Sequence, residues 1–256
     1  MRSCGDKRYP VLLVEESSRS KYAGNRGDLM LVTSFVAPMF ATNCWVIASG
    51  PGQECIIVDP GMPDISHEIT ALVAEHGLKP VATLITHGHL DHTFSVLPLT
   101  KSIPMRTFIT GNDRFLLSNP LGALDSGGVS EQFLNAFGSE NFYEPSDVVE
   151  VEDFSTFELA GLELTSIFAP GHTKGSVIFT VDDQHLISGD VLFAGSIGRT
   201  DLPTGSALDM RKTLRERILT LPDGLNVLPG HGGQTTIGIE RVRNPYLQSD
   251  FLDQGG

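Results

Sequence analysis

The sequence THGHLDH at residues 86–92 directly follows the apolar run VATLI at residues 81–85. It places three imidazoles and one carboxylate within six residues, beside a glycine that permits a tight turn. Histidine nitrogens and carboxylate oxygens are ligands that a divalent cation such as zinc prefers. The apolar run predicts a buried strand, and open α/β folds place their sites where strands end. The stretch therefore predicts a metal site at the carboxyl edge of a sheet, holding one cation or shared between two.

Three further ligand-type side chains follow apolar runs farther along the chain. They are His172 in PGHT, Asp190 in SGD and His231 in PGHG. Each lies beside a glycine and just after a predicted strand, so we expect all three to join the first cluster. The remaining histidines lie in a predicted helix or at the start of a predicted strand, and we assign them surface or structural roles. These are His67, His76 and His185.

The composition indicates a globular protein with an acidic surface. The 256 residues are 40% hydrophobic and 19% charged, which suits a sizeable core. The chain has 31 acidic and 18 basic residues, so its formal charge is −13. This negative charge opposes binding to nucleic acid or to an anionic membrane. No apolar run approaches the roughly 20 residues of a membrane span. We expect a small-molecule substrate, and the sequence leaves the oligomeric state open.

Cysteine is sparse, with Cys4, Cys44 and Cys55 only. A hairpin across residues 50–52 would place Cys55 opposite Ala48 rather than Cys44, so we expect two buried free thiols instead of a disulfide. Free thiols fit a reducing compartment, and no secretory leader is visible. The sequence therefore predicts a cytoplasmic protein.

Residues 1–29 are polar and lack clear periodicity, so we predict a flexible N-terminal extension, with an extra edge strand over residues 11–14 as the alternative.

The first predicted helix begins with Asp64 as its N-cap and ends at Gly77. Residues 112–147 are a candidate lid or substrate loop, or ordinary surface packing. The other predicted elements are strands over 31–36, 43–49, 54–59, 81–86, 105–109, 156–159, 162–168, 177–181, 185–188 and 226–228, and helices over 64–76 and 207–219.

The order HxHxDH, PGH, GD and PGHG resembles the metallo-β-lactamase superfamily, and all seven donor positions match. The resemblance implies an α/β fold of the αββα sandwich type, with two packed mixed sheets and outer helices. It also implies that residues 30–256 form one hydrolase domain of this fold.

The resemblance further implies two divalent metal ions, with Asp190 bridging them. Zinc is the metal we expect, with iron or manganese as alternatives, because redox relatives carry Glu at the position of His89. A metal-bound hydroxide would be the nucleophile, oriented by Asp91, so Asp91 and Asp190 are the predicted catalytic residues. The first metal would be held by His87, His89 and His172, and the second by Asp91, His92 and His231.

Two further segments, GSIGRTD at 195–201 and RVRNPYL at 241–247, resemble the short glyoxalase II-like hydrolases. That group cleaves thioesters of the S-2-hydroxyacyl-glutathione type. Two departures put glutathione itself in doubt. Arg199 and Asp201 stand where glyoxalase II has a Lys and a Tyr that hold glutathione, and only 25 residues follow His231, too few for its C-terminal helical domain. Arg199 is the predicted substrate-binding residue, with a salt bridge to Asp201 as the alternative.

The main alternative is a persulfide dioxygenase of the same fold, which would bind a single iron through positions equivalent to His87, His172 and Asp190. The PGHG form around His231 favours the hydrolase. A lactonase is a second alternative, because attack on a cyclic ester uses the same metal geometry. A non-catalytic binding module is disfavoured, since no ligand of the family pattern is missing.

Overall fold

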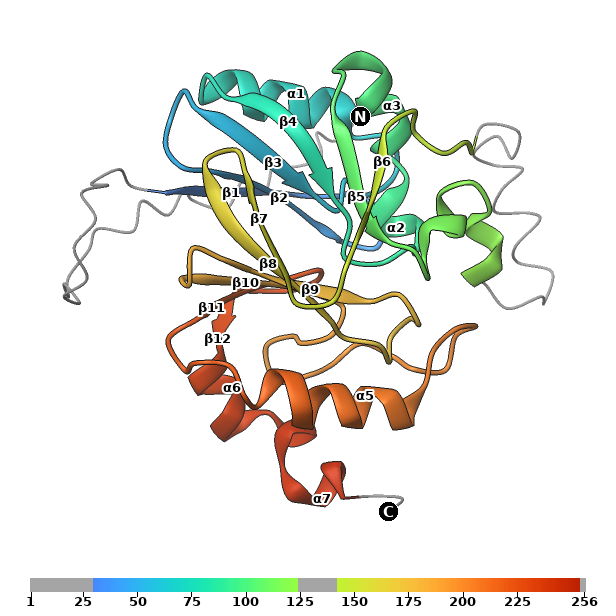
Figure 1. Cartoon of the computed structure of the whole chain (residues 1–256), viewed down its shortest axis with the longest axis vertical. Coiled ribbons are helices and arrows are strands. Elements are labelled where there is room, and N and C mark those ends of the chain that lie inside the picture. The colour runs from blue at the N-terminus through green and yellow to red at the C-terminus, as the bar shows by residue number, and fades with distance from the viewer. Residues whose placement is uncertain (1–29, 124–141, 254–256) are drawn as a thin grey trace, which may run out of the picture.

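The computed structural model describes residues 30–123 and 142–253. Two six-stranded sheets pack face to face, and helices cover the outer face of each sheet (Figure 1). The predicted αββα sandwich is confirmed. The predicted N-terminal extension, half of the candidate lid and Cys4 lie outside the described residues.

The first sheet has the order β1-β2-β3-β4-β5-β6. Antiparallel pairs join β1 to β2 and β2 to β3, whereas β3 to β6 run parallel. The sheet is therefore mixed, and its parallel part delivers strand ends to one edge. Its strands are β1 (Leu31–Val36), β2 (Asn43–Ala48), β3 (Glu54–Val58), β4 (Lys79–Leu84), β5 (Arg106–Thr110) and β6 (Val148–Val151).

The second sheet has the order β12-β11-β10-β9-β8-β7, and only β10 and β11 pair in parallel. A register shift in that pair falls between Ile187 and Gly189, just before Asp190. Its strands are β7 (Ser155–Leu159), β8 (Leu162–Phe168), β9 (Val177–Val181), β10 (His185–Gly189), β11 (Asn226–Pro229) and β12 (Thr235–Thr236).

Strand side chains alternate between a central core and two outer cores. In β2, Trp45 and Ile47 lie between the sheets, while Val46 packs under the helices of the first sheet. In β9, Phe179 lies between the sheets and Ile178 packs under the helices of the second. Both faces of these strands are thus buried, which explains why apolar residues predominate in their sequences.

The helices form the two outer layers (Figure 1). The first sheet is covered by α1 and α3, and the second by α5, α6 and α7. The short α2 follows β4 and carries two donors of the HxHxDH motif. Their bounds are α1 (Ser66–Glu75), α2 (Leu90–Thr93), α3 (Val96–Ser102), α5 (Ala207–Thr213), α6 (Ile237–Arg243) and α7 (Ser249–Leu252), with turns η1 (Arg114–Leu117), η2 (Pro120–Ala123), η4 (Leu214–Ile218) and η5 (Pro245–Leu247).

Several local predictions need correction. Helix α1 begins at Ser66 with Ile65 as its N-cap, so the prediction of Asp64 as N-cap is wrong, although the Asp64 carboxylate accepts a hydrogen bond from the Ser66 N–H. The single helix predicted over 207–219 is α5 followed by the π-helical turn η4. Strands β6 and β12 and helices α6 and α7 were not predicted.

Two predictions in the same region are confirmed. Gly77 follows α1 with a φ of 64°, a left-handed conformation that glycine adopts at little cost. Cys55 pairs with Ala48, and both Cys44 and Cys55 are buried free thiols. Burial raises the pKa of Cys55 to about 12, so this thiol is inert at neutral pH.

Candidate metal centre

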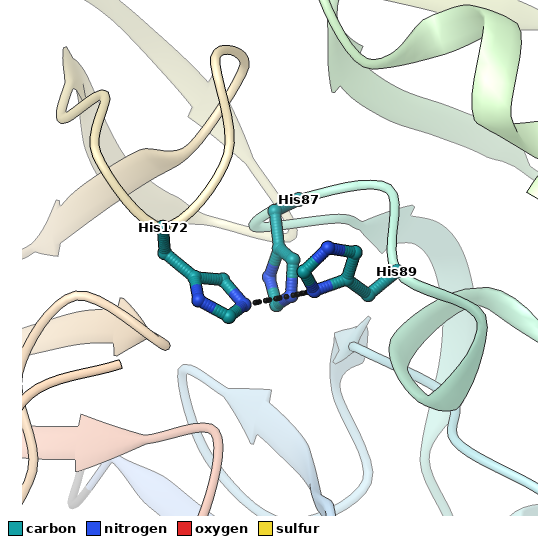
Figure 2. A group of neighbouring side chains, drawn as sticks. All are labelled: His87, His89 and His172. Carbon is teal, nitrogen blue, oxygen red and sulfur yellow. Dashed lines mark hydrogen bonds between the residues drawn. The ribbon is translucent and has the colours of Figure 1, made fainter. Parts of the chain in front are cut away.

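Three buried imidazoles converge from two loops on opposite sheets. His87 and His89 come from the loop after β4, and His172 comes from the loop after β8 (Figure 2). The His87 Nε2 atom lies 3.1 Å from His89 Nδ1 and 3.2 Å from His172 Nε2. These atoms form a group within 4.8 Å of one another, a geometry that could hold a metal ion. We call this group the first trio.

A second trio lies beside the first, at the solvent-facing side. It consists of Asp91, His92 and His231, whose ligand atoms also lie within 4.8 Å of one another. The Nε2 atoms of His92 and His231 are 3.2 Å apart, and Asp91 Oδ2 lies 3.3 Å from His231 Nε2. The side chains of His231 and Asp91 are 26% and 22% exposed, so a small molecule can approach this side.

Asp190, at the end of β10, lies between the trios. Its Oδ2 atom is 3.5 Å from His172 Nε2 and 3.4 Å from His231 Nε2, and its Oδ1 atom is 3.5 Å from His92 Nε2. Asp190 Oδ1 is buried and has no hydrogen-bond partner within the described structure. The Asp190 carboxylate therefore faces both trios. One of its oxygens has no hydrogen-bond partner, and a bound cation could take that place.

The hydrogen bonds behind the first trio leave bare nitrogens facing inward. His172 Nδ1 donates to the Arg199 carbonyl at 2.7 Å, so in the neutral, metal-binding form of this ring its Nε2 carries the lone pair. The Thr86 hydroxyl donates to Asp59 at 2.7 Å and lies 3.1 Å from His87 Nδ1, which makes this nitrogen the donor and His87 Nε2 bare as well. Two lone pairs at 3.2 Å repel each other unless a cation lies between them. The donor set thus fits a divalent metal ion.

Burial keeps two imidazoles of the first trio, those of His87 and His89, neutral. It lowers the pKa of His87 well below its usual range, and the neighbouring histidines add to the effect. Burial likewise lowers the pKa of His89 to about 3. Neutral imidazole is the form that binds metal, so no proton has to leave these two rings before a cation enters.

Charge dominates the second trio. Burial alone would lower the pKa of His92, but Asp190, Asp91 and Asp59 together raise it well above the usual range. Burial is opposed in the same way at His231, where the carboxylates of Asp190 and Asp91 raise the pKa to about 9. In the absence of metal this side is a compact set of ion pairs, and an entering dication would replace the protons.

The same positive charges act on the two carboxylates. Burial would raise the pKa of Asp91, but His92 and a hydrogen bond from His231 lower it to about 2. The pKa of Asp190 is held well below its usual range, because His92 and His231 outweigh its burial. Both carboxylates are therefore ionised at neutral pH.

Asp59 orients the cluster from behind and was not predicted. It follows β3 with a φ of 47°, and its carboxylate accepts hydrogen bonds from the Thr86 backbone and hydroxyl at 2.9 and 2.7 Å. The same group lies 3.0 Å from His92 Nδ1. Asp59 thus fixes a ring in each trio, directly or through Thr86. Its only sequence signal was a carboxylate that follows an apolar strand.

The loop after Asp190 is held by two buried side chains of the C-terminal layer. The Glu240 carboxylate accepts hydrogen bonds from Gly195 N–H at 2.7 Å and from Asn244 Nδ2 at 2.9 Å. Asn244 Nδ2 also donates to the Ser196 carbonyl at 3.0 Å. A side chain at Gly198 would come within 1.9 Å of the Asp190 carbonyl, so this loop lies tightly against the site. Neither Glu240 nor Asn244 was predicted, although the RVRNPYL segment contains Asn244.

Arg199 forms the ion pair that the sequence offered as the alternative to substrate binding. Its Nε and Nη2 atoms donate to the two carboxylate oxygens of Asp201, each at 2.7 Å. Both side chains are exposed, at 60% and 67%. Substrate binding by Arg199 stays a prediction.

The described parts of the candidate lid lie around a cavity of about 590 Å³ beside α2. Phe142, Tyr143 and Pro145 line it together with Leu90 and Thr93 of α2. Closure over the metal centre stays a prediction, because residues 124–141 lie outside the described structure.

A family model of the metallo-β-lactamase superfamily matches residues 37–231. The chain belongs to this superfamily. It is 38% identical over 226 residues to an uncharacterised protein of Mycobacterium tuberculosis, covering 86% of this chain and 98% of that one. It is 34% identical over 218 residues to the probable metallo-hydrolase YqgX of Bacillus subtilis, covering 85% and 97%. Hydroxyacylglutathione hydrolase GloC of Haemophilus influenzae is 30% identical over 213 residues, covering 82% and 94%.

Solved structures of the superfamily match over the same extent. The BLEG-1 B3 metallo-β-lactamase superposes with a TM-score of 0.72 at 27% identity, covering 85% of this chain and all of that one. TTHA1623 in a di-iron-bound form gives 0.68 at 30% identity, covering 84% and 100%. Together with the histidine and aspartate cluster, these likenesses make the chain a metallo-hydrolase of the superfamily.

Across residues 30–123 and 142–253, no helix combines the length and apolar character that crossing a membrane requires.

Proposed function

We propose that the chain is a dinuclear metal-dependent thioesterase of the glyoxalase II-like type, cleaving S-2-hydroxyacyl thioesters. The observation that carries the proposal is the pair of adjacent trios with Asp190 between them. His87, His89 and His172 would hold one metal ion, and Asp91, His92 and His231 the other. Asp190 would contact both, which accounts for its unpartnered oxygen. Zinc is the metal we expect.

The protein residues around this pair have distinct roles in hydrolysis. When bound, two divalent ions supply Lewis acidity and make water nucleophilic near neutral pH. Asp91, which is ionised and partly exposed, would accept a hydrogen bond from the attacking water and so orient it. The His172 imidazole is held in one tautomer by the Arg199 carbonyl, which keeps its Nε2 directed inward. The second trio borders solvent, so we place the substrate on that side.

The thioester class is supported by chemistry and by similarity. A thiolate is a good leaving group, so its departure needs little help from a general acid, and within the described structure the site holds no uncommitted acid. Every titratable group of the two trios is a proposed ligand. GloC of Haemophilus influenzae, named as a hydroxyacylglutathione hydrolase, is 30% identical over almost its whole length. In this proposal Arg199 of the GSIGRTD segment would bind an anionic end of the substrate in exchange for Asp201.

The second trio also separates this proposal from a persulfide dioxygenase. A single iron held by His87, His172 and Asp190 would leave Asp91, His92 and His231 without a role, yet their ligand atoms lie within 4.8 Å of one another. This arrangement favours two metal ions and hydrolysis. A lactonase would use the same two ions, so substrates rather than structure distinguish it.

The decisive experiment combines metal analysis of the purified protein with three assays. We expect about two metal ions per chain, hydrolysis of S-lactoylglutathione or a related 2-hydroxyacyl thioester, and slower turnover of lactones. One iron per chain with persulfide-dependent oxygen uptake would replace the proposal with the dioxygenase. Lactone turnover that exceeds thioester turnover would assign the lactonase.

A further inference from the structure

Asp113 is a buried carboxylate, outside the proposed ligand set, that contacts two separate loops. It lies after β5, at the start of turn η1. Its Oδ2 atom accepts hydrogen bonds from the Gly88 N–H at 2.8 Å and from the Thr173 hydroxyl at 2.7 Å. Its Oδ1 atom accepts one from the Gly175 N–H at 2.8 Å. One side chain therefore joins a loop of the first sheet to a loop of the second.

These contacts fall beside the proposed ligands. Gly88 separates His87 from His89, and Thr173 directly follows His172. The first trio is therefore split between the two loops that Asp113 joins, and the carboxylate binds each loop next to its ligand.

His89 has a particular need for such support. Its Nε2 atom is buried and has no hydrogen-bond partner within the described structure, whereas the outer nitrogens of His87 and His172 face Thr86 and the Arg199 carbonyl. A metal-binding histidine is usually oriented by a partner on its outer nitrogen. Because His89 has no such partner, the position of its ring depends on the position of its backbone. The hydrogen bond from the Gly88 N–H to Asp113 holds that backbone in place.

The packing around Asp113 leaves little freedom. A Cβ atom at Gly175 would lie 2.4 Å from Asp113 Cγ, and one at Gly88 would lie 2.9 Å from the Asp113 carbonyl and 2.5 Å from Leu116 Cδ1. Gly175 thus approaches the Asp113 carboxylate, and Gly88 approaches the Asp113 backbone and Leu116, at distances that only glycine permits. Burial raises the pKa of Asp113, while its three hydrogen bonds act in the opposite direction.

We infer that Asp113 is a positioning residue that sets the separation of His89 and His172, and thereby the affinity of the first trio for its metal ion. It acts through the Gly88 N–H and the Thr173 hydroxyl and does not touch the metal or the substrate. The inference rests on the proposed metal centre. It adds a residue that affects metal binding by the first trio and not by the second.

The test measures zinc affinity of Asp113→Asn by competition with a chromophoric chelator in two backgrounds. His231→Ala disables the second trio, and His172→Ala disables the first. An asparagine side chain keeps one acceptor oxygen, so at least one of the N–H donors of Gly88 and Gly175 would face an NH₂ group. We expect zinc affinity to fall about 10- to 100-fold in the His231→Ala background and to stay unchanged in the His172→Ala background.

Cobalt substitution adds a spectroscopic measurement. In the His231→Ala background, Asp113→Asn should alter the d–d absorption of bound Co²⁺, because the ligand geometry changes. Asp183→Asn, at an exposed turn, is the matched control and should alter neither affinity nor spectrum. If Asp113→Asn does not fold, as judged by circular dichroism and thermal unfolding, Thr173→Val carries the test. It removes one of the three hydrogen bonds and should give a smaller loss of affinity in the same background.

Three outcomes have different meanings. Unchanged affinity in the His231→Ala background, for whichever variant folds, would overturn the inference. Equal losses in both backgrounds would also overturn it, because they would show a general structural effect. Failure of the unmodified protein to bind zinc, cobalt or iron would instead refute the proposed function.

Discussion

The two sheets contribute to the metal centre in different ways. The first sheet supplies four donors from one segment of six residues after β4, the loop and the start of α2, whereas the second supplies three donors from three loops, after β8, β10 and β11. Local backbone geometry determines the positions of the first four donors, because a single turn fixes where their side chains point. The positions of the other three depend on how β10 and β11 pair and how the loop at residues 193–199 is held.

The side chains that hold the ligand loops also differ between the two sheets, being direct in the first and indirect in the second. Behind the first sheet, Asp59 contacts the ligand loop directly through Thr86 and His92. Behind the second, Glu240 and Asn244 hold a loop that in turn reaches His172 through a backbone carbonyl. We therefore expect changes near the first sheet to act on metal binding, and changes near the second to act first on stability and then on the site.

The largest effect tests whether the two sheets serve one centre. His87→Ala from the first sheet and Asp190→Ala from the second should each lower kcat/KM by about 1,000-fold or more, since Lewis-acid stabilisation of a transition state is worth several kcal/mol. Metal content, measured by atomic emission, should fall in parallel. The exposed His67→Ala is the control. Near-normal turnover of either variant would mean that the site is misplaced.

A second test concerns the direct support behind the first sheet. Asp59→Asn removes an acceptor from Thr86 or His92, so it should lower metal affinity about 10- to 100-fold. Chelator competition measures the change, with Asp183→Asn as the exposed control. Unaltered affinity would show that the backbone alone orients this loop.

A third test concerns the indirect support behind the second sheet. Glu240→Ala removes the acceptor that the Gly195 N–H and Asn244 Nδ2 share, so it should destabilise the fold by about 1–3 kcal/mol. Urea unfolding of the metal-free protein measures this loss, and Glu216→Ala at an exposed position is the control. We expect metal affinity to fall less than for Asp59→Asn. A larger fall would reverse the proposed contrast between the sheets.

Arg199 gives a smaller effect, confined to substrate. Because Asp201 already pairs with this exposed guanidinium, Arg199→Ala should raise KM for anionic thioesters about fivefold with little change in kcat. Steady-state kinetics with an anionic and a neutral thioester measures the difference. If both substrates respond alike, or neither does, Arg199 serves the loop and not the substrate.

The smallest effect is a pH dependence away from the metal centre. Burial lowers the pKa of His185, at the start of β10, below its usual 6.5. The unfolded chain therefore binds a proton at this histidine before the folded protein does, and stability falls as pH decreases below about 6.5. His185→Gln should weaken this fall in urea unfolding between about pH 7.5 and about pH 5.5, whereas the exposed His67→Gln should not. Identical slopes for all three proteins would contradict the assignment.

Much of the fold was predictable because its strands are long and apolar. Strands such as β2 and β9 are buried on both faces, so apolar residues fill most positions of each, with Asn43 and Thr180 as the exceptions. The missed elements are short or marginal. Strand β6 has only one fully buried residue, Val151, and β12 has two residues, so neither leaves a periodic pattern. Asp64 follows the N-cap rule by residue type, but the buried Ile65 occupies that position.

The sequence by itself determined the seven ligand-type residues, since each follows an apolar strand and lies in a short motif with glycine or proline. Their assignment to two metal ions stays a prediction, and the structure brings all seven side chains together. Only the tertiary structure revealed Asp59, Asp113, Glu240 and Asn244. A carboxylate or amide acquires such a role through hydrogen bonds to loops 25 to 62 residues away, as between Asp113 and Gly88 or Gly175, and no local pattern encodes that distance.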